Sequence, residues 1–214
     1  MLRIAITVIF FLSLAGSAYA GPLDDQLVAA AKAGKTAEVR SLIRKGADVN
    51  ARDADGATAL IKAVVNDRRL AVSALIENGA DIEAKNRQGE TPLMGAALNG
   101  LTYMVRMLLS RGANPNFKAH DGETALMMAA LMGHTGAARE LIAHKADINA
   151  QNNDHLTPLI AAAYAGHKDM VSLLLKKGAN PNVKARGGKA ALDFAREKHF
   201  DEIVNMLIKA GIKK

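Results

Sequence analysis

Apolar residues recur along this chain at a fixed step of 33 positions. The leucines that keep this step are Leu60, Leu93, Leu126, Leu159 and Leu192, and the alanines are Ala63, Ala96, Ala129, Ala162 and Ala195. A threonine stands two positions before each of the first four leucines. Several residue types that share one 33-residue step indicate stacked repeats. One short unit cannot bury its apolar face alone and must pack it against the apolar face of the next unit. The chain is therefore predicted to form a stack whose function lies on its surface.

Each repeat is predicted to hold two helices and a turn. The threonine can accept a hydrogen bond from an unpaired amide of the first helical turn, and Pro92 and Pro158 suit the first position of that helix. Glycines follow both helices at places where a left-handed residue ends a helix, as Gly133 and Gly178 do. The second helix has apolar residues at steps of three and four, as in 104–109, which places them on one face.

The third unit resembles the ankyrin repeat. Residues 88–100 read Gln-Gly-Glu-Thr-Pro-Leu-Met-Gly-Ala-Ala-Leu-Asn-Gly, and residues 108–114 read Leu-Leu-Ser-Arg-Gly-Ala-Asn. The same pattern recurs in 55–82, 121–148 and 154–182, with degenerate copies at 27–50 and 187–212. The resemblance implies an all-α ankyrin-repeat solenoid of stacked helix-turn-helix units with short β-turn or hairpin tips. We expect its repeats at 23–53, 54–86, 87–119, 120–152, 153–185 and 186–214, the first and last being polar caps.

A few positions depart from the repeat pattern. Lys145, Asp67 and His155 stand where other repeats have glycine, so local strain or a longer turn is expected there. Glu83 replaces the asparagine that four other repeats carry. A histidine commonly follows Thr-Pro-Leu in the ankyrin family, whereas this chain has Ile61, Met94, Met127, Ile160 and Asp193 at that place. We expect apolar packing to replace the polar network of such histidines.

The first twenty residues differ in kind from the rest. Arg3 precedes an almost unbroken apolar run over 4–15, and residues 18–20 match the small-x-small pattern before a signal-peptidase site. A retained membrane anchor is the rival interpretation, but the run is shorter than the roughly 20 residues that span a bilayer. We therefore expect a signal peptide at 1–20, cleavage after Ala20, an ankyrin-repeat domain at 21–214 and no integral membrane association after cleavage. A bacterial periplasmic or secreted protein fits the lack of any Asn-x-Ser/Thr sequon.

Composition narrows the function classes. The sequence has no cysteine, so no disulfide supports the fold. Its net charge is +7, and the excess lies in 176–214, which holds 10 basic and 4 acidic residues. Such a patch can attract an anionic partner, or it can simply keep the last repeat soluble. Nucleic acid is not expected as a partner, because an exported protein rarely meets it and the chain lacks aromatic residues for base stacking.

We find no constellation of residues for catalysis. The chain lacks cysteine, a Gly-x-Ser-x-Gly elbow, a phosphate-binding glycine loop and a His-Glu-x-x-His zinc helix. His134 and His167 occupy a place where the ankyrin family uses histidine for packing. The polar residues on neighbouring tips are His120, Asp121, Glu123, Asp154 and His155. Adjacent repeats lie roughly 10 Å apart, which is too far for these residues to share a metal ion at about 2 Å each, so we predict no metal site. Because no catalytic motif is present, we also predict no enzyme activity and no cofactor.

One row of positions is expected to face the concave side of the stack. It lies at the ends of the first helices, where ankyrin proteins vary residues to suit their partners, and comprises Val65, Asn66, Leu98, Asn99, Leu131, Met132, Tyr164 and Ala165. The turn tips would form a polar rim through Asp55, Arg87, Gln88, Glu90, His120, Asp121, Glu123, Asn153, Asp154 and Leu156. The row is unusually apolar for exposed surface, which suits a partner-binding groove. Alternatively, these side chains lean into the stack.

The sequence thus favours an exported, non-enzymatic scaffold that binds a protein partner through a concave groove and turn tips. Its desolvated anchors are expected to be Leu98, Leu131, Met132 and Tyr164. Resemblance suggests an immunity or inhibitor role, or support of an envelope enzyme, and does not choose between them. The alternative is adhesion to an anionic envelope component through the basic C-terminal cap, at Lys176, Lys177, Lys184, Arg186, Lys189 and Lys198. Two polar caps give no reason for self-association, so a monomer is expected.

Overall fold

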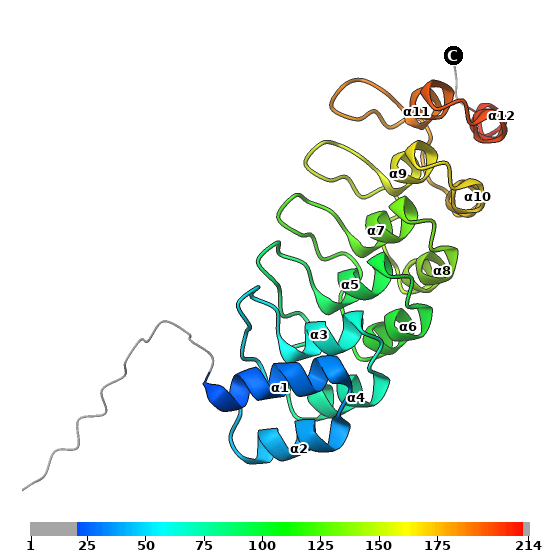
Figure 1. Cartoon of the computed structure of the whole chain (residues 1–214). Coiled ribbons are helices and arrows are strands. Elements are labelled where there is room, and N and C mark those ends of the chain that lie inside the picture. Colours follow the sequence, from blue (N-terminus) through cyan, green and yellow to red (C-terminus); the bar gives the residue numbers. More distant parts are fainter. Residues whose placement is uncertain (1–20, 212–214) are drawn as a thin grey trace, which may run out of the picture.

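A computed structural model describes residues 21–211, whose twelve helices form six stacked pairs (Figure 1). The inner row consists of α1 (Pro22–Ala33), α3 (Ala59–Val65), α5 (Pro92–Leu98), α7 (Ala125–Leu131), α9 (Pro158–Tyr164) and α11 (Ala191–Glu197). The outer row consists of α2 (Thr36–Arg44), α4 (Arg69–Glu77), α6 (Thr102–Ser110), α8 (Thr135–Ala143), α10 (Lys168–Lys176) and α12 (Asp201–Lys209). Each inner helix packs against the next inner helix and against its own outer partner. The predicted all-α solenoid of helix pairs is confirmed.

Two parts of the chain lie outside the described residues. These are 1–20, where the signal peptide is predicted, and 212–214 at the other end. Within 21–211, no helix combines the length and the apolar character needed to cross a membrane.

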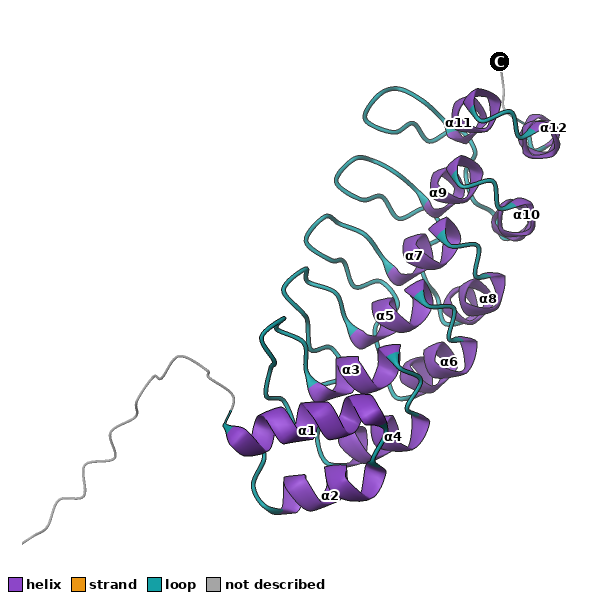
Figure 2. Cartoon of the chain, viewed as in Figure 1, coloured by secondary structure: helices purple, strands orange, loops and turns teal. Residues whose placement is uncertain are grey.

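Five finger loops, at 51–57, 84–90, 117–123, 150–156 and 183–189, project beside the inner helices (Figure 2). A backbone hydrogen bond closes each tip, as from the Ala119 amide to the Glu123 carbonyl at 2.9 Å. Backbone bonds of 2.8–3.1 Å link the last four loops, from His120 to Gln88, from Asn153 to Asp121 and from Arg186 to Asp154. The described loops contain no strand, only an isolated bridge between Arg52 and Thr58, so the tips are linked turns.

Threonine begins four of the inner helices, as predicted. The hydroxyl oxygens of Thr58, Thr91, Thr124 and Thr157 accept hydrogen bonds of 3.2–3.4 Å from the amides three residues further on. All four side chains are buried, so each cap also removes an orphan amide from an apolar interior. At α11, Asp193 compensates for the missing threonine, because its carboxylate accepts from the Ala190 amide at 2.8 Å.

The backbone is strained at the positions where another residue replaces the glycine of the repeat pattern. The non-glycine residues with left-handed φ in 21–211 are Asp67 (54°), Lys145 (66°), His155 (59°) and His199 (58°). The 33-residue step continues through the first three positions, so the turns have not lengthened. Each such residue costs about 1–2 kcal/mol relative to an ordinary conformation. Asp67 also forms an ion pair with Arg69 at 3.2 Å.

The core runs continuously between the two helix rows. Alanines at the closest approaches and leucines, valines and methionines around them are buried along the whole described stack. Met94, Met127 and Ile160 are buried at the place where the ankyrin family commonly has histidine. Ile61 is buried at the same place, so the expectation that apolar packing replaces those histidines is confirmed at four repeats, whereas Asp193 in the last repeat is half-buried.

Two other histidines connect neighbouring repeats. Nε2 of His134 hydrogen-bonds the Leu98 carbonyl at 3.1 Å, and Nε2 of His167 hydrogen-bonds the Leu131 carbonyl at 2.9 Å. Each ring lies against the glycine that follows the first helix of the preceding repeat, where an added Cβ would come 2.6 Å from the ring. The packing role expected for these histidines agrees with both contacts.

Glu83 makes a poorer connection than the asparagines at its register. Asn116 accepts from an amide of the next repeat at 2.7 Å and donates to a carbonyl there at 3.0 Å. Glu83 accepts from the Asn114 amide at 2.6 Å, but its Oε2 is buried without a hydrogen-bond partner. Burial raises the pKa of Glu83, as does Asp81, and this outweighs the lowering by the Asn114 amide and Lys85.

Candidate partner-binding groove

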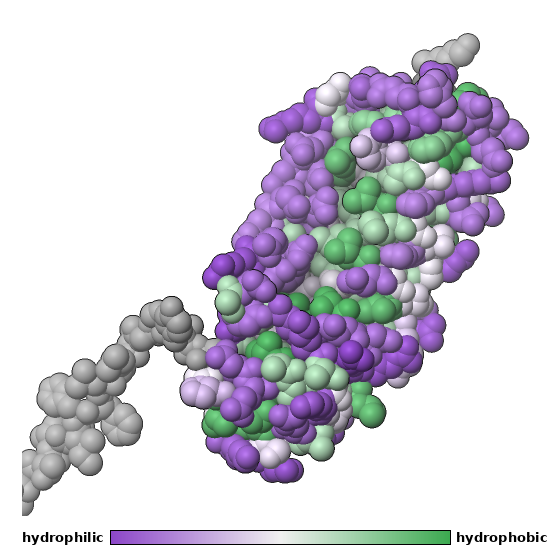
Figure 3. Space-filling model, viewed as in Figure 1, coloured by the Kyte–Doolittle hydropathy of each residue, from purple (hydrophilic) through white to green (hydrophobic). Residues whose placement is uncertain are grey.

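The concave side of the stack is a groove between the inner helices and the finger loops. Figure 3 shows hydrophobic residues along the middle of this face and hydrophilic residues on either side. The large apolar residues at the ends of its helices are Leu98, Leu131, Met132 and Tyr164, with exposed fractions of 36%, 37%, 48% and 47%. These four belong to the row predicted from the sequence, and they remain exposed rather than leaning fully into the stack.

The N-terminal part of the row is more closed. Val65 and Asn66 are half-buried, and Val65 lies over Gly95, where an added Cβ would come 2.8 Å from the valine Cγ1. The side-chain amides of Asn66 and Asn99 each donate at 2.8 Å to the carbonyls of Lys62 and Gly95, respectively. These two asparagines therefore satisfy the last turns of α3 and α5. Ala165, at the other end of the predicted row, is also half-buried.

Lys62 forms ion pairs with two carboxylates at the N-terminal end of the groove. Its Nζ lies 2.9 Å from Asp53 Oδ2 and 3.3 Å from Asp55 Oδ2. Burial acts to raise the pKa of Asp53, but hydrogen bonds from Lys62 and from the amides of Ala57 and Asp55 lower it overall. The same hydrogen bond to Asp53 raises the pKa of Lys62. The charge of Asp55, a predicted rim residue, is thus compensated within the protein.

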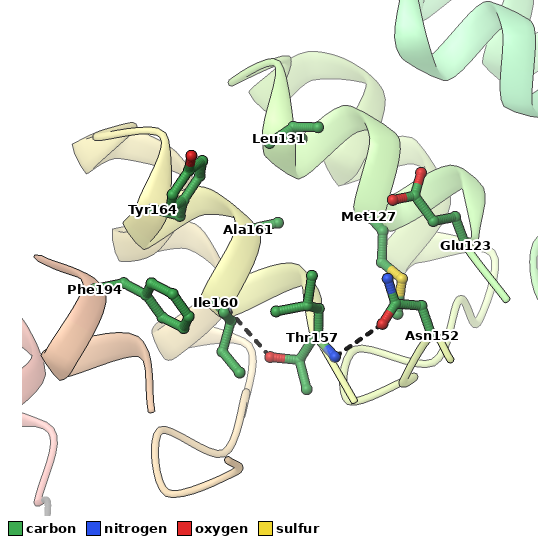
Figure 4. Close-up of a pocket in the computed structure, with 10 residues that line it drawn as sticks. Glu123, Met127, Leu131, Asn152, Thr157, Ile160, Ala161, Tyr164 and Phe194 are labelled. Atoms are coloured by element: carbon green, nitrogen blue, oxygen red, sulfur yellow. Dashed lines mark hydrogen bonds between the residues drawn. The ribbon is translucent and has the colours of Figure 1, made fainter. Parts of the chain in front are cut away.

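The C-terminal part of the groove opens into a pocket of about 280 Å³ between α7, α9 and α11 (Figure 4). Leu131 and Tyr164 line it from the helix ends, and Glu123 and Leu156 line it from the finger loops. The Tyr164 ring meets the Phe194 ring edge-on, with centroids 5.9 Å apart and planes at 86°. The structure therefore brings together four of the predicted site residues, and they surround a mainly apolar hollow.

The predicted rim residues divide into two groups. Those exposed at the tips are Asp55, Arg87, Gln88, His120, Asp121, Asn153 and Asp154, and those half-buried on the loops are Glu90, Glu123 and Leu156. Several exposed tips also support the preceding loop: an added Cβ on Gly89 would come 2.6 Å from the His120 ring, and one on Gly122 would come 2.8 Å from the Asn153 side chain. Part of the rim therefore has a structural role in spacing the fingers.

Glu123 places a carboxylate at the α7 end of the pocket without a cation to balance it. Burial raises the pKa of Glu123, and the charges of Asp121 and Glu90 raise it further. Within residues 21–211, no lysine or arginine forms an ion pair with Glu123. Glu90 differs, since it accepts a hydrogen bond from Asn86 Nδ2 at 2.6 Å.

Cations lie at the opposite, α11 end of the pocket. Lys198 Nζ lies 4.9 Å from the centroid of the Tyr164 ring, and Lys189 Nζ lies 5.8 Å from that of Phe194. Lys189 is paired with Glu197 at 2.7 Å, whereas Lys198 forms no ion pair in the described part of the chain. The pocket consequently has one acidic and one basic end.

A family model described as ankyrin repeats, in three copies, matches residues 27–119, 66–153, 93–185 and 146–214. The chain belongs to the ankyrin-repeat family. No curated protein matches the sequence. Ankyrin repeats indicate a protein–protein interaction scaffold, which directs attention to the groove and tips of this stack.

Sequence reasoning missed six further residues that line the pocket of this ankyrin stack. They are Met127, Asn152, Thr157, Ile160, Ala161 and Phe194. Phe194 was the easiest of these residues to predict from the sequence. It stands at the same position of the repeat as Ala161 and Gly95 and so lies on the same side of its helix as they do. Phe194 nevertheless lies outside the predicted row, whose positions in the sixth repeat are Glu197 and Lys198.

The finger tips of the ankyrin stack show no metal-binding geometry in the region described. Nowhere in residues 21–211 do three or more histidine, aspartate or glutamate side chains gather closely enough to hold a metal ion. His155, one of the tip residues considered for such a site, instead places Nδ1 3.2 Å from Gln151 Oε1.

Proposed function

We propose that this ankyrin-repeat protein is an exported, non-enzymatic scaffold that binds one protein partner through its groove and finger tips. The observation that supports this most directly is the row Leu98, Leu131, Met132 and Tyr164, four large apolar side chains exposed along one groove. Exposed apolar surface with a polar rim is typical of binding sites on soluble proteins. Removing such surface from water is favourable by roughly 25 cal/mol per square ångström, from which the entropy cost of association is subtracted.

Two of these side chains are suited to act as anchors because their supports are already in place. Tyr164 rests edge-on against Phe194, and the last turn of α7 at Leu131 is held by His167. Binding energy concentrates in a few large, well-supported side chains near the centre of an interface. Little conformational entropy is then lost at these positions when the partner arrives.

Export is the part of this proposal that rests on the sequence of residues 1–20. A basic start, a short apolar run and a small-x-small site favour cleavage after Ala20 and release into a bacterial periplasm or medium. In that compartment the scaffold could serve as an immunity or inhibitor protein, or support an envelope enzyme. N-terminal sequencing of the purified protein tests export directly, and a first residue other than Gly21 argues against this cleavage site.

The groove is tested with a double variant, Leu131→Asp with Tyr164→Asp, in a protein expressed from the whole 214-residue sequence. Placing two charges in the apolar row should reduce partner binding by about 100-fold or more, because each charge must be desolvated on binding. The measurement is affinity capture from the native envelope fraction at low and high salt, followed by mass spectrometry. One stoichiometric protein retained at high salt is the expected result.

A matched control is available on the outer helices. Leu70 and Tyr103 are also exposed, at 75% and 49%, and lie in the first turns of the outer helices α4 and α6. Leu70→Asp with Tyr103→Asp should leave capture unchanged, and both double variants should keep the wild-type circular dichroism spectrum. Equal capture by the groove variant and this control would falsify the groove assignment.

The alternative function is adhesion to an anionic envelope component through the basic C-terminal cap. It is favoured by the exposure of all six cap residues, of which only Arg186 and Lys189 form ion pairs in residues 21–211. Binding of this kind weakens steeply with added salt, because screening acts on exposed charges. Retention at low salt alone, or of lipid and polysaccharide alone, would favour the cap over the groove.

A further inference from the structure

The size of the pocket limits what it can hold. Its volume of about 280 Å³ lies just below the roughly 300–1,000 Å³ of typical small-molecule sites. One wall is aromatic, from Tyr164 and Phe194, and the other is aliphatic, from Leu131 and Met127 (Figure 4). A single large apolar side chain, presented by a longer segment, suits a hollow of this size and chemistry.

At the acidic end of the pocket, Glu123 has no counter-ion among the described residues. A ligand could supply one. Glu123 lies at the α7 end, at the opposite side of the pocket from Phe194 (Figure 4). Its neighbours Asp121 and Glu90 add negative charge, and the pKa of Glu123 is raised because burial and these charges oppose ionisation. A lysine or arginine of a ligand placed here would relieve this repulsion and keep the carboxylate ionised.

At the basic end of the pocket, a ligand would have to supply a negative charge. Lys198 lies over the Tyr164 ring without an ion pair in the described residues, while Lys189 is already balanced by Glu197. Asp154, the remaining carboxylate of this part of the rim, is paired with Arg186 at 3.7 Å. The uncompensated charges beside the pocket are therefore negative at α7 and positive at α11.

We propose that the groove binds an extended segment of its partner that carries a basic residue, a large apolar residue and an acidic residue in that spatial order from α7 to α11. The apolar side chain fills the pocket, the basic side chain meets Glu123 and the acidic side chain meets Lys198. Two repeat spacings of roughly 10 Å separate the charges, which on the order of six extended residues can span. This inference rests on the proposed groove function and adds the chemistry of the partner.

A phage-displayed library of random peptides, about twelve residues long to exceed this span, tests the proposal without knowledge of the partner. Selection on the wild-type protein should enrich peptides in which a leucine, methionine or aromatic residue lies between a basic and an acidic residue. Selection on Glu123→Gln should lose the basic preference and keep the acidic one, whereas Lys198→Gln should do the opposite. Each substitution should weaken an individual wild-type peptide by about three- to tenfold.

Matched controls exchange charges far from the pocket. Asp25→Asn on α1 and Lys209→Gln on α12 remove exposed charges of the same kinds and should leave the selected pattern unchanged. Circular dichroism and denaturant unfolding confirm that all variants fold.

The outcomes separate this inference from the proposed function. Peptides that require Leu131 and Tyr164 but show no charge order overturn the inference and leave the groove as a binding site. Peptides that bind the Leu131→Asp, Tyr164→Asp variant as well as wild type overturn both. The absence of any enriched peptide also overturns the inference, while affinity capture of a partner still decides the proposed function.

Discussion

The two ends of the groove are built from the same repeat, yet they treat their carboxylates in opposite ways. At the N-terminal end Lys62 contacts both Asp53 and Asp55, and the pKa of Asp53 is lowered because hydrogen bonding outweighs burial. At the C-terminal end Glu123 pairs with no lysine or arginine of residues 21–211, and burial raises its pKa. Lys62 balances both carboxylates at the N-terminal end, whereas Glu123 and Lys198 form no ion pair within residues 21–211.

The residues on the floor of the groove also differ between its two ends. The residue four positions after the helix N-cap is Lys62 in α3, Gly95 in α5, Met128 in α7, Ala161 in α9 and Phe194 in α11. Val65 packs over Gly95 and closes the groove there, whereas Ala161 borders the 280 Å³ pocket. Within the same repeat scaffold, the groove is thus closed by Val65 at Gly95 and open at Ala161.

The same substitution at two equivalent positions gives the largest expected contrast. Gly95→Phe must displace Val65, whose β-branched side chain cannot easily move, so the free energy of unfolding should fall by about 1–2 kcal/mol. Ala161→Phe points into free space, so its unfolding free energy should change by less than about 0.5 kcal/mol. Urea unfolding followed by circular dichroism measures both values.

Binding provides the second half of this contrast. Ala161→Phe fills the pocket and should weaken a groove ligand by at least about tenfold, or 1.4 kcal/mol, because it occupies the space of the apolar side chain. A filled pocket with unchanged affinity shows that the pocket is not part of the binding surface. Equal destabilisation by both substitutions shows that the two ends do not differ in packing.

Glu83 extends the comparison to a carboxylate outside the groove, one of whose oxygens is buried without a hydrogen-bond partner. Glu83→Asn restores the residue of four other repeats, and at one of them Asn116 both accepts and donates across the repeat interface. We expect the free energy of unfolding to rise by about 1 kcal/mol at pH 7. Asn116→Glu is the matched reverse change and should lower it by a similar amount.

The pH dependence identifies the cause of the Glu83 effect. Because the folded pKa of Glu83 is raised above 4.5, ionisation penalises the folded state at neutral pH, and this penalty disappears as the pH falls through the folded pKa to 4.5. The advantage of Glu83→Asn should therefore shrink in acid. An advantage that is constant between pH 7 and pH 4 would instead assign it to packing.

The sequence predicted the scaffold better than the site for a physical reason. Helix starts depend on local chemistry, and the four capping threonines bond as their spacing implied. The exposed row, from Leu98 to Tyr164, follows from the same period. Exposure at one repeat depends on the side chain of the next, however, and the closing of the groove by Val65 over Gly95 could not be seen from either residue alone.

The pocket was harder to predict because it arises between three repeats. Ile160 and Met127 were expected in the core, and they are buried, yet they also border the hollow that Ala161 leaves. Phe194 lies in a repeat treated only as a polar cap. The charge order across the pocket depends on which carboxylates Arg186 and Lys189 reach in space, and sequence spacing does not determine this.

The smallest expected effect is also the most direct test of the opening comparison, because one chemical change should have opposite signs at the two ends. Asp53→Asn keeps the turn, since Asn86 at the same register accepts the same two amide bonds at 2.9 and 3.0 Å, but it removes a charge from Lys62. The free energy of unfolding should fall by about 0.5 kcal/mol, a value that allows for solvent screening. Glu123→Gln removes an unbalanced charge and should raise it by about 0.3 kcal/mol.

The signs can be checked against pH. The lowered pKa of Asp53 contributes stability above its ordinary 3.8 that is lost as the pH falls through the folded value, so the cost of Asp53→Asn should disappear in strong acid. The raised pKa of Glu123 imposes its penalty above the folded pKa, so the gain from Glu123→Gln should disappear by pH 4.5. Chemical unfolding of both variants between pH 3 and pH 8 provides the measurement. Two changes of the same sign at pH 7 would mean that the carboxylates at the two ends are equivalent, and the proposed charge order of the groove would lose its basis.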